Sequence, residues 1–198
     1  MRSKKFSGPL TLSALVLAVT TVTAGMVQAS AIRYALEPQQ SNVGFQASFG
    51  GGGLTGAMPV KSANVTLDFA SLANCTINVV LDVTNATANF PFATLVMKSS
   101  DVLDAARYQT ISFTSTAVRS SGDGAEVDGM ITLHGVTRPI TLSAQLYRQT
   151  AVKPGDLSKI EVLLTGTVKR SQFGADGWGM LVGDAVHLHI LAALSKAG

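Results

Sequence analysis

Alternation of apolar and polar residues is the feature that most constrains the fold of this chain. Apolar residues recur at every second position in five runs, which begin at residues 77, 111, 140, 160 and 186. Successive side chains of a β-strand point to opposite faces of a sheet, so this period gives each strand one apolar face. The many Val, Ile and Thr residues in these runs suit a pleated strand. The sequence therefore predicts an all-β fold.

Glycine-rich and polar turn signals separate the runs. They are GGGG at residues 50–53, SSGDG at 120–124, KPGD at 153–156 and VGD at 182–184. The segment LHGVTRPITL, residues 133–142, joins two expected strands, and Gly135 allows a positive φ at its turn. Pro139 lacks an N–H, which is tolerated where we expect the second strand to start. We interpret the segment as a hairpin connection rather than a catalytic loop.

One stretch, PFATLVMKSSDVLDAARY at residues 91–108, breaks the alternation. Its apolar residues fall at helical spacing on both sides of Ser99, Ser100 and Asp101, which are residues that favour helix ends. We expect one short helix before the serines and another after them. Closing an antiparallel sheet removes its exposed edges, so the remaining strands favour a barrel or a sandwich. Long strands in sequence order favour an up-and-down barrel.

The first 31 residues have the order of a secretory signal peptide. Three basic residues precede an apolar run at residues 10–24, and small residues follow at the spacing of a cleavage site after Ala29 or Ala31. The apolar run is too short and too interrupted by Thr and Ser for a membrane span, which needs ~20 apolar residues. We therefore expect export to the periplasm and a single domain over residues 32–198.

Composition argues against a nucleic-acid partner and against a disulfide. The chain carries 15 Lys and Arg residues against 12 Asp and Glu, and three of the basic residues belong to the leader. The remainder is neutral, so the net charge gives no support for nucleic-acid binding, which needs a basic patch or stripe. The single cysteine, Cys75, cannot form an intramolecular disulfide. It shares strand parity with Ile77 and Val79, so we expect it to be buried and unreactive.

Two motifs resemble functional sites, a glycine-rich nucleotide-binding motif and a pair of histidines, but we interpret both as structural. GGGLTG, residues 51–56, matches G-x-G-x-x-G, but a new strand at residues 62–69 follows it instead of a helix. We interpret it as a turn at the end of a barrel. His187 and His189 share the strand face opposite the apolar stripe, and the only other histidine is His134. A metal site needs more ligands than this pair, so we expect both to cover the outer face.

Five segments of the chain carry a family resemblance through their order and spacing. They are YALEPQQSNVGFQA, SSDVLDAARYQTISFTST, LHGVTRPITL, KRSQFG and VGDAVHLHI, and together they cover nearly the whole expected domain. They resemble the YceI-like family of exported, polyisoprenoid-binding proteins, although Gln40 and Gln109 stand where that family usually has His and Pro. The resemblance implies an extended, lipocalin-like antiparallel β-barrel, whose apolar lumen holds a long isoprenoid or related lipid.

The candidate ligand contacts are the inward-facing apolar residues of such an eight-stranded barrel, together with Leu95, Phe173 and Trp178 from outside its strands. They are Phe45, Val79, Leu81, Leu95, Phe113, Ile131, Leu133, Leu142, Val162, Leu164, Phe173, Trp178, Leu188 and Ile190. Phe173 and Trp178 come from the irregular segment at residues 170–180, and we expect them over one end of the lumen, as a gate or as a plug. A barrel of this size holds either side chains or one ligand, and the resemblance favours a ligand.

These observations predict an exported, non-enzymatic protein that holds a long-chain polyisoprenoid or related lipid for transport or storage. Such a protein needs no cofactor and no metal. The sequence leaves open a transient contact with a membrane and a homodimer. Two alternatives remain at this point. One is a secreted metal-dependent or hydrolytic enzyme that uses His187 and His189, with Glu161. The other is a stress-linked partner protein whose barrel is filled and free of ligand.

Overall fold

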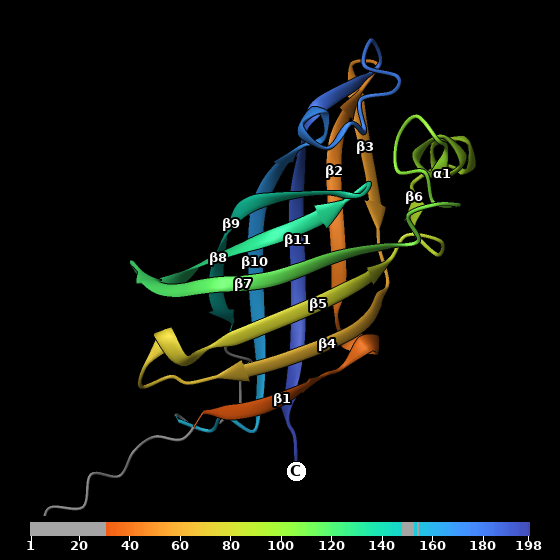
Figure 1. Ribbon diagram of the computed structural model, residues 1–198. Coiled ribbons are helices and arrows are strands. Elements are labelled where there is room, and N and C mark those ends of the chain that lie inside the picture. The colour runs from red at the N-terminus through yellow and green to blue at the C-terminus, as the bar shows by residue number, and fades with distance from the viewer. Residues whose placement is uncertain (1–30, 148–152, 154) are drawn as a thin grey trace, which may run out of the picture.

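The computed structural model describes residues 31–147, 153 and 155–198, and it is built mostly from β-strands (Figure 1). The helical elements of the described residues are α1 (Pro91–Lys98), η1 (Pro38–Gln40), η2 (Leu72–Asn74) and η3 (Arg170–Phe173). The strands are β1 (Ile32–Leu36), β2 (Asn42–Phe49), β3 (Gly52–Ala57), β4 (Val60–Leu67), β5 (Thr76–Asp82), β6 (Thr87–Ala88), β7 (Thr110–Ser121), β8 (Gly124–Leu133), β9 (Val136–Tyr147), β10 (Lys159–Lys169) and β11 (Val182–Lys196). The expected leader lies, apart from Ala31, outside the described residues.

The sheet closes into an eight-stranded antiparallel barrel, which confirms the expected fold class. Neighbouring strands follow the order β1-β4-β5-β7-β8-β9-β10-β11, and β11 pairs again with β1. The strands β2, β3 and β6 continue the lines of β1, β4 and β5, because β2 pairs with β11 and β3, and β3 pairs with β6. Each neighbour in the wall is then the next segment along the chain, which is the up-and-down order.

An interruption at η1 lets the first strand bend as it runs along β11. Leu36 of β1 lies opposite Leu194, and Asn42 of β2 lies opposite Leu191. The Ser41 hydroxyl joins this interruption to β11, since it accepts a hydrogen bond of 3.0 Å from the amide of Ala193. The strands β2, β3 and β6 thereby prolong the wall at the end of the barrel that carries α1 (Figure 1).

Only the first of the two expected helices is present. After α1, the amides of Leu103 and Ala105 donate hydrogen bonds of 3.1 Å to the carbonyls of Met97 and Lys98. Asp104, between them, has a positive φ of 44°. The expectation of a second helix is wrong because the chain folds back in turns, which satisfy carbonyls left free at the end of α1. Leu103 and Ala105 are buried in these turns, so their positions in the sequence reflect burial and not a second helix.

The hairpin expected at residues 133–142 is confirmed, with a different start for its second strand. His134 and Gly135 join β8 to β9, and both have positive φ, 49° and 74°, as a type I′ turn requires. β9 begins at Val136, so Pro139 lies inside the strand rather than at its start. It is tolerated there because β9 pairs with β10 only from Ser143 onward, which leaves Pro139 one neighbouring strand.

Two glycine-rich segments that we expected as turns belong largely to strands. Among residues 50–56 only Gly50 and Gly51 have positive φ, and the residues that follow form β3 between β2 and β6. The VGD segment opens β11, where the register with β2 shifts between Val182 and Val186. Pairing across the sheet overrides the local turn preference at both places, and a bulge absorbs the irregular sequence in the second.

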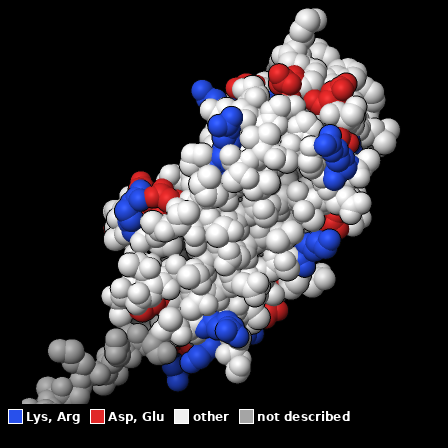
Figure 2. Space-filling model, in the orientation of Figure 1, with Lys and Arg blue, Asp and Glu red and all other residues white. Residues whose placement is uncertain are grey.

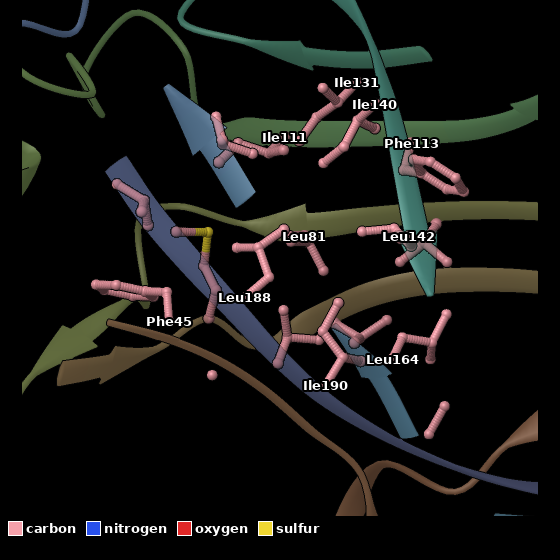
Figure 3. Close-up of a pocket in the computed structure, with 18 of the residues that line it drawn as sticks. Phe45, Leu81, Ile111, Phe113, Ile131, Ile140, Leu142, Leu164, Leu188 and Ile190 are labelled. Carbon is pink, nitrogen blue, oxygen red and sulfur yellow. The ribbon is translucent and has the colours of Figure 1, made fainter. Parts of the chain in front are cut away.

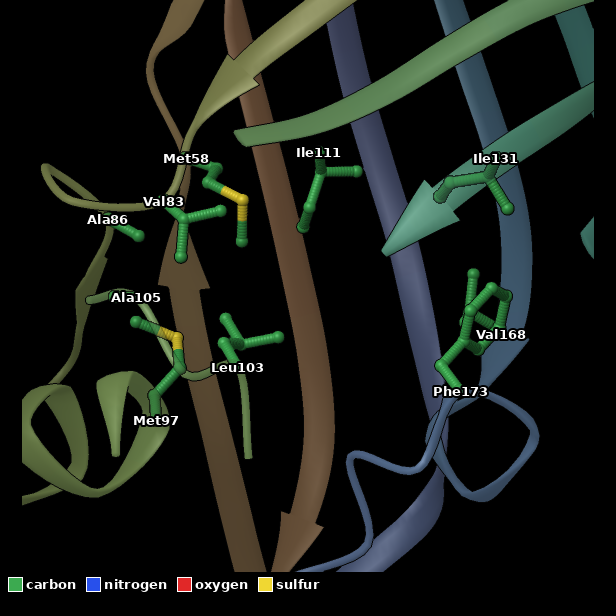
Figure 4. Close-up of a cluster of buried hydrophobic side chains, with 10 residues drawn as sticks. All are labelled: Met58, Val83, Ala86, Met97, Leu103, Ala105, Ile111, Ile131, Val168 and Phe173. Atoms are coloured by element: carbon green, nitrogen blue, oxygen red, sulfur yellow. The ribbon is translucent and has the colours of Figure 1, made fainter. Parts of the chain in front are cut away.

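Buried side chains form three clusters along the barrel. The cluster nearest α1 contains Met58, Val83, Ala86, Met97, Leu103, Ala105, Ile111, Ile131, Val168 and Phe173 (Figure 4). A second lies around Val127 and Leu142, and a third lies around Tyr34, whose hydroxyl donates a hydrogen bond of 2.8 Å to the carbonyl of Leu157. No helix within the described residues is long and apolar enough to cross a membrane.

Candidate functional site

A cavity of about 450 Å³ occupies the interior of the barrel, and every long strand contributes to its wall (Figure 3). The alternation of the sequence explains the lining, because residues two apart on each strand face inward. Phe113 and Leu188, for example, pack beside both of the neighbouring clusters, yet each is only partly buried. The inward side chains therefore surround space instead of filling it.

Twelve of the fourteen candidate residues lie on the cavity wall. They are Phe45, Val79, Leu81, Phe113, Ile131, Leu133, Leu142, Val162, Leu164, Trp178, Leu188 and Ile190. Figure 3 shows several of these side chains pointing toward one another from different strands. All of them except Trp178 come from strands, where the period of two fixes which face a residue occupies. Their contact with a ligand stays a prediction.

The other two candidates do not line the cavity. Leu95 is 71% exposed, because α1 turns Ala93 and Met97 toward the core and leaves Leu95 on its outer face. Phe173 is 2% exposed and packs in the cluster nearest α1, together with Val168 (Figure 4). Leu95 therefore does not face the lumen and Phe173 packs in the end of the barrel, and contact of either residue with a ligand stays a prediction.

Trp178 lies at the end of the cavity that carries α1. Its ring meets the ring of Phe92 edge-on, with 5.9 Å between the ring centroids. Both side chains line the cavity, and both are also exposed, Phe92 by 55% and Trp178 by 43%. Aromatic pairs prefer this edge-to-face geometry. The two rings therefore form a contact between the interior of the barrel and its surface.

The cavity wall includes a cation that sequence reasoning missed. Arg170, at the start of η3, is 7% exposed and reaches the cavity beside Trp178. Its guanidinium donates hydrogen bonds to four carbonyls in the connection to β11, those of Ala175 (2.7 Å), Gly177 (2.7 Å), Val182 (2.9 Å) and Gly183 (3.0 Å). Burial lowers the pKa of Arg170 below its usual value, and Asp184 and Asp176 oppose that shift.

Cys75 is buried, as its strand parity predicted, and it also touches the cavity. Its sulfur accepts a hydrogen bond of 3.3 Å from the amide of Asp68. Burial raises the pKa of the Cys75 thiol above its usual value. A thiol that resists ionisation is a poor nucleophile, so the cavity gains an apolar atom rather than a reactive group.

The paired histidines lie on the outer face of the barrel, where we expected them. Nδ1 of His187 lies 3.0 Å from the hydroxyl oxygen of Thr167, and His189 is exposed on the same strand. Hydroxyl and amide side chains of neighbouring strands surround them, and the cavity lies on the other side of the wall. Within the described residues no cluster of three or more His, Cys, Asp or Glu side chains could hold a metal ion.

The closed barrel and its apolar interior define a lipocalin-like architecture. The chain belongs to the YceI-like family, because the model of the YceI-like domain matches residues 34–194. Protein YceI from an Escherichia coli strain is 32% identical over 136 residues, which cover 68% of this chain and 71% of that protein. A UPF0312 protein of Vibrio vulnificus is 37% identical over 93 residues, about half of each chain.

Solved structures share the fold at lower sequence identity. BcnA of Burkholderia cenocepacia superposes with a TM-score of 0.70 at 19% identity, over 80% of this chain and 99% of that one. A domain from Saccharophagus degradans, described as a polyisoprenoid binding domain implicated in plant cell wall breakdown, gives a TM-score of 0.57 at 15% identity, over 85% and 100% of the two chains. These likenesses agree with the barrel found here.

Proposed function

We propose that this protein is an exported, non-enzymatic carrier or store that holds a long-chain polyisoprenoid or a related lipid in its barrel. The observation that carries the proposal is the cavity of about 450 Å³, whose wall is almost entirely apolar. Ligand pockets are typically concave and mostly apolar, within a range of roughly 300–1,000 Å³. The polyisoprenoid-binding description of the Saccharophagus degradans domain supports the same class of ligand.

Burial of hydrocarbon supplies enough free energy for binding. Each buried CH₂ contributes about 0.8 kcal/mol, so one five-carbon isoprene unit contributes roughly 4 kcal/mol as an upper bound. Several units exceed the ceiling of ~20 kcal/mol on real affinities, and the ordering of a flexible chain absorbs the difference. We therefore expect affinity to rise with tail length and to level off when the lumen is full.

The polar groups of the cavity wall support binding rather than catalysis. The Ser41 hydroxyl is held between backbone groups of Glu37 and Ala193, and Arg170 is held by four carbonyls. Nucleophilic catalysis needs a nucleophile within hydrogen-bond reach of a base. Among the described residues of the cavity wall, no hydrogen bond joins a nucleophile to a base. The pair His187 and His189 lies outside the cavity, which weighs against the metal-dependent alternative.

Native mass spectrometry with isoprenoid alcohols of graded length tests the proposal. Leu164→Trp places a larger ring in the lumen, so we expect it to bind shorter tails than the wild type. Leu163→Trp is the matched control, because Leu163 is the next residue on β10, is 39% exposed and does not line the cavity. It should bind as the wild type does. A smaller obstruction, Val162→Phe, serves if Leu164→Trp fails to fold.

Two results count against the carrier. One is that no tail length binds to the wild type, and the other is that lipid extraction of the purified protein yields nothing. Either result favours a filled barrel that acts through a partner. Export has its own test, since mass spectrometry of protein from the periplasm should show an amino terminus at Ser30 or Ile32. An intact Met1 in that material contradicts export.

A further inference from the structure

Three segments at one end of the barrel carry no charged residue. They are residues 42–60, which include the turn between β2 and β3, residues 83–97, which include most of α1, and residues 177–183, which open β11. Charged residues make up 14% of the chain, so three segments of this combined length without a charged residue are notable. We call these three segments together the uncharged tip.

The segments of the uncharged tip are joined to one another. The amide of Gly50, in the β2–β3 turn, donates a hydrogen bond of 3.0 Å to the carbonyl of Leu181. The rings of Phe49 and Phe90 lie 5.6 Å apart, and Phe92 meets Trp178 as described above. In Figure 1 the β2–β3 turn and the connection into β11 form the upper extremity of the molecule, with α1 beside them. The tip is therefore one continuous surface.

Large apolar side chains project from this surface into solvent. Of the ten large hydrophobic side chains exposed among the described residues, five lie in the tip: Phe92 (55%), Leu95 (71%), Trp178 (43%), Met180 (100%) and Leu181 (46%). Isolated exposed apolar residues are ordinary, whereas a group of them marks an interaction site. Figure 2 shows the topmost atoms of the molecule white, with charged side chains directly below them and others spread along the face.

The opposite end of the barrel is different in character. Phe69 and Leu146 line the cavity there and are 42% and 38% exposed. Asp123 on the cavity wall and Lys159 at the start of β10 accompany them. The tip also has charged neighbours, because Lys98, Asp176 and Asp184 directly flank its segments, but none of these residues lies within the segments themselves. An apolar surface enters a bilayer only where charge is absent, because a charged group is costly to move out of water. The two ends are therefore not equivalent.

We propose that the uncharged tip docks on a lipid bilayer and that the lipid tail passes between the bilayer and the lumen there. Phe92 and Trp178 line the cavity and are exposed, so the lumen meets the surface within the docking site. Tryptophan favours the interface between headgroups and acyl chains. Met180 projects fully, which suits insertion into a fluid layer better than a flat protein interface. The lipid-transfer role rests on the proposed function, and docking is tested separately from it.

Fluorescence of the single tryptophan reports on the tip directly. Vesicles of phosphatidylethanolamine, with and without phosphatidylglycerol, should shift Trp178 emission to shorter wavelength, and acyl-brominated lipid in them should quench it. Because the tip has no charge, the effect should depend little on phosphatidylglycerol or on salt. Emission that vesicles leave unchanged, or a shift that vanishes without phosphatidylglycerol or at high salt, overturns the proposal.

Vesicle flotation with paired variants locates the surface. Met180→Ser with Leu181→Ser changes two tip residues that do not line the cavity, and we expect vesicle affinity to fall at least about tenfold, since each removes an apolar side chain from the bilayer. Quenching of Trp178 should fall with it. Met130→Ser with Leu163→Ser is the matched control, because these residues are 37% and 39% exposed on β8 and β10, away from the tip. Equal losses in both pairs overturn the proposal.

The remaining arms separate docking from lipid binding and from self-association. Leu164→Trp obstructs only the lumen, so it should still float with vesicles even where it no longer binds isoprenoid. Loss of flotation in a folded Leu164→Trp protein contradicts docking by the tip. Sedimentation without vesicles tests a second copy as the occupant. A dimer that the Met180→Ser, Leu181→Ser pair dissociates assigns the surface to self-association and overturns membrane docking.

Discussion

Arg170 holds the connection between η3 and β11 by binding four backbone carbonyls with one side chain. Lysine keeps the charge but lacks the planar array of donors, so Arg170→Lys leaves several of these carbonyls without a partner. A buried polar group that loses its partner costs about 1–3 kcal/mol. We expect Arg170→Lys to lower the free energy of unfolding by roughly 2–4 kcal/mol in urea denaturation.

Arg138→Lys is the control for that measurement. Arg138 is exposed and donates one hydrogen bond, of 3.3 Å, from Nε to the carbonyl of Gln172 in the same region. Its replacement should change the free energy of unfolding by about 0.5 kcal/mol or less, as is usual at the surface. Equal effects of the two substitutions mean that Arg170 does not organise the connection.

Asp82 gives the fold a defined response to acid. Its carboxylate accepts hydrogen bonds from the side chains of Thr84 (2.5 Å) and Asn85 (2.8 Å), and these lower the pKa of Asp82 to about 2. The same turn accepts a hydrogen bond of 2.6 Å from Lys98 of α1, through the carbonyl of Thr84. The Asp82 turn therefore helps to hold α1.

Because folding lowers this pKa from an unfolded value of ~3.9, the charged form stabilises the native state. That stabilisation is complete well above the unfolded pKa and disappears as pH falls through about 2. The melting temperature of Asp82→Asn should therefore lie below that of the wild type at neutral pH, and the two should converge in strong acid. A difference that stays constant over the whole range contradicts this role for the carboxylate.

The candidate site could be predicted from the sequence where residues lie on strands, and less well elsewhere. Strand parity alone placed residues such as Leu81 and Leu164 on the cavity wall. Leu95 was misplaced because helical spacing shows which residues share a face of α1, and not which face meets the barrel. Arg170 was missed because its burial depends on carbonyls in an irregular connection, which leave no periodic signal.

The β8–β9 hairpin depends on a glycine more than its turn type alone requires. Gly135 has a φ of 74°, and a β-carbon at this position would lie 2.6 Å from the nearest atom of the Tyr108 ring. Gly122, in the β7–β8 turn, has a φ of 55°, and no heavy atom lies within 4 Å of the corresponding position. A side chain at Gly122 would therefore meet backbone strain alone, whereas one at Gly135 would meet both backbone strain and a steric conflict with Tyr108.

We expect Gly122→Ala to cost about 1 kcal/mol, which is the strain of a left-handed residue with a side chain. Gly135→Ala should cost roughly 1–3 kcal/mol more, because the methyl group must displace Tyr108. Chemical denaturation of both variants measures the difference. Truncating the ring, as Tyr108→Ala, should bring the cost of Gly135→Ala down toward that of Gly122→Ala. If it does not, contact with the ring is not the cause.

At the level of elements, the alternation of apolar and polar residues predicted the long strands and the hairpin at Gly135. Short turn motifs were less reliable predictors. GGGLTG and VGD contain the residues of turns, yet pairing with β2 draws both into the sheet. The second expected helix failed for a related reason, because hydrogen bonds to the end of α1 competed with helix formation. Strand pairing decided the first two segments and hydrogen bonds to the end of α1 decided the third, and a local residue pattern carries no information on either.

For the whole molecule, the closure of the sheet into a barrel determines how much space remains inside it. Eight strands leave an interior that side chains can fill or that one ligand can occupy. Here the clusters near α1 and around Tyr34 contribute side chains to the wall toward the two ends, and the cavity of about 450 Å³ runs along the barrel. Water gains few hydrogen bonds from an apolar wall, and a lining without contacts loses dispersion energy. An apolar ligand restores those contacts, so the ligand should be part of the stability of the barrel.

Removal of ligand should therefore lower the melting temperature of the protein. A ligand that binds only the native state adds about 2.7 kcal/mol at a free concentration of 100 times Kd. For a chain of this size each kcal/mol shifts the melting temperature by about 2–4 °C, so extraction should lower it by roughly 5–10 °C. Calorimetry before extraction, after extraction and after return of a long isoprenoid alcohol measures the change. Leu164→Trp should respond weakly, and Leu163→Trp, on the outer face, should respond as the wild type does. A barrel filled by its own side chains would melt at one temperature in all three conditions, and that result would rule out a ligand as part of the fold.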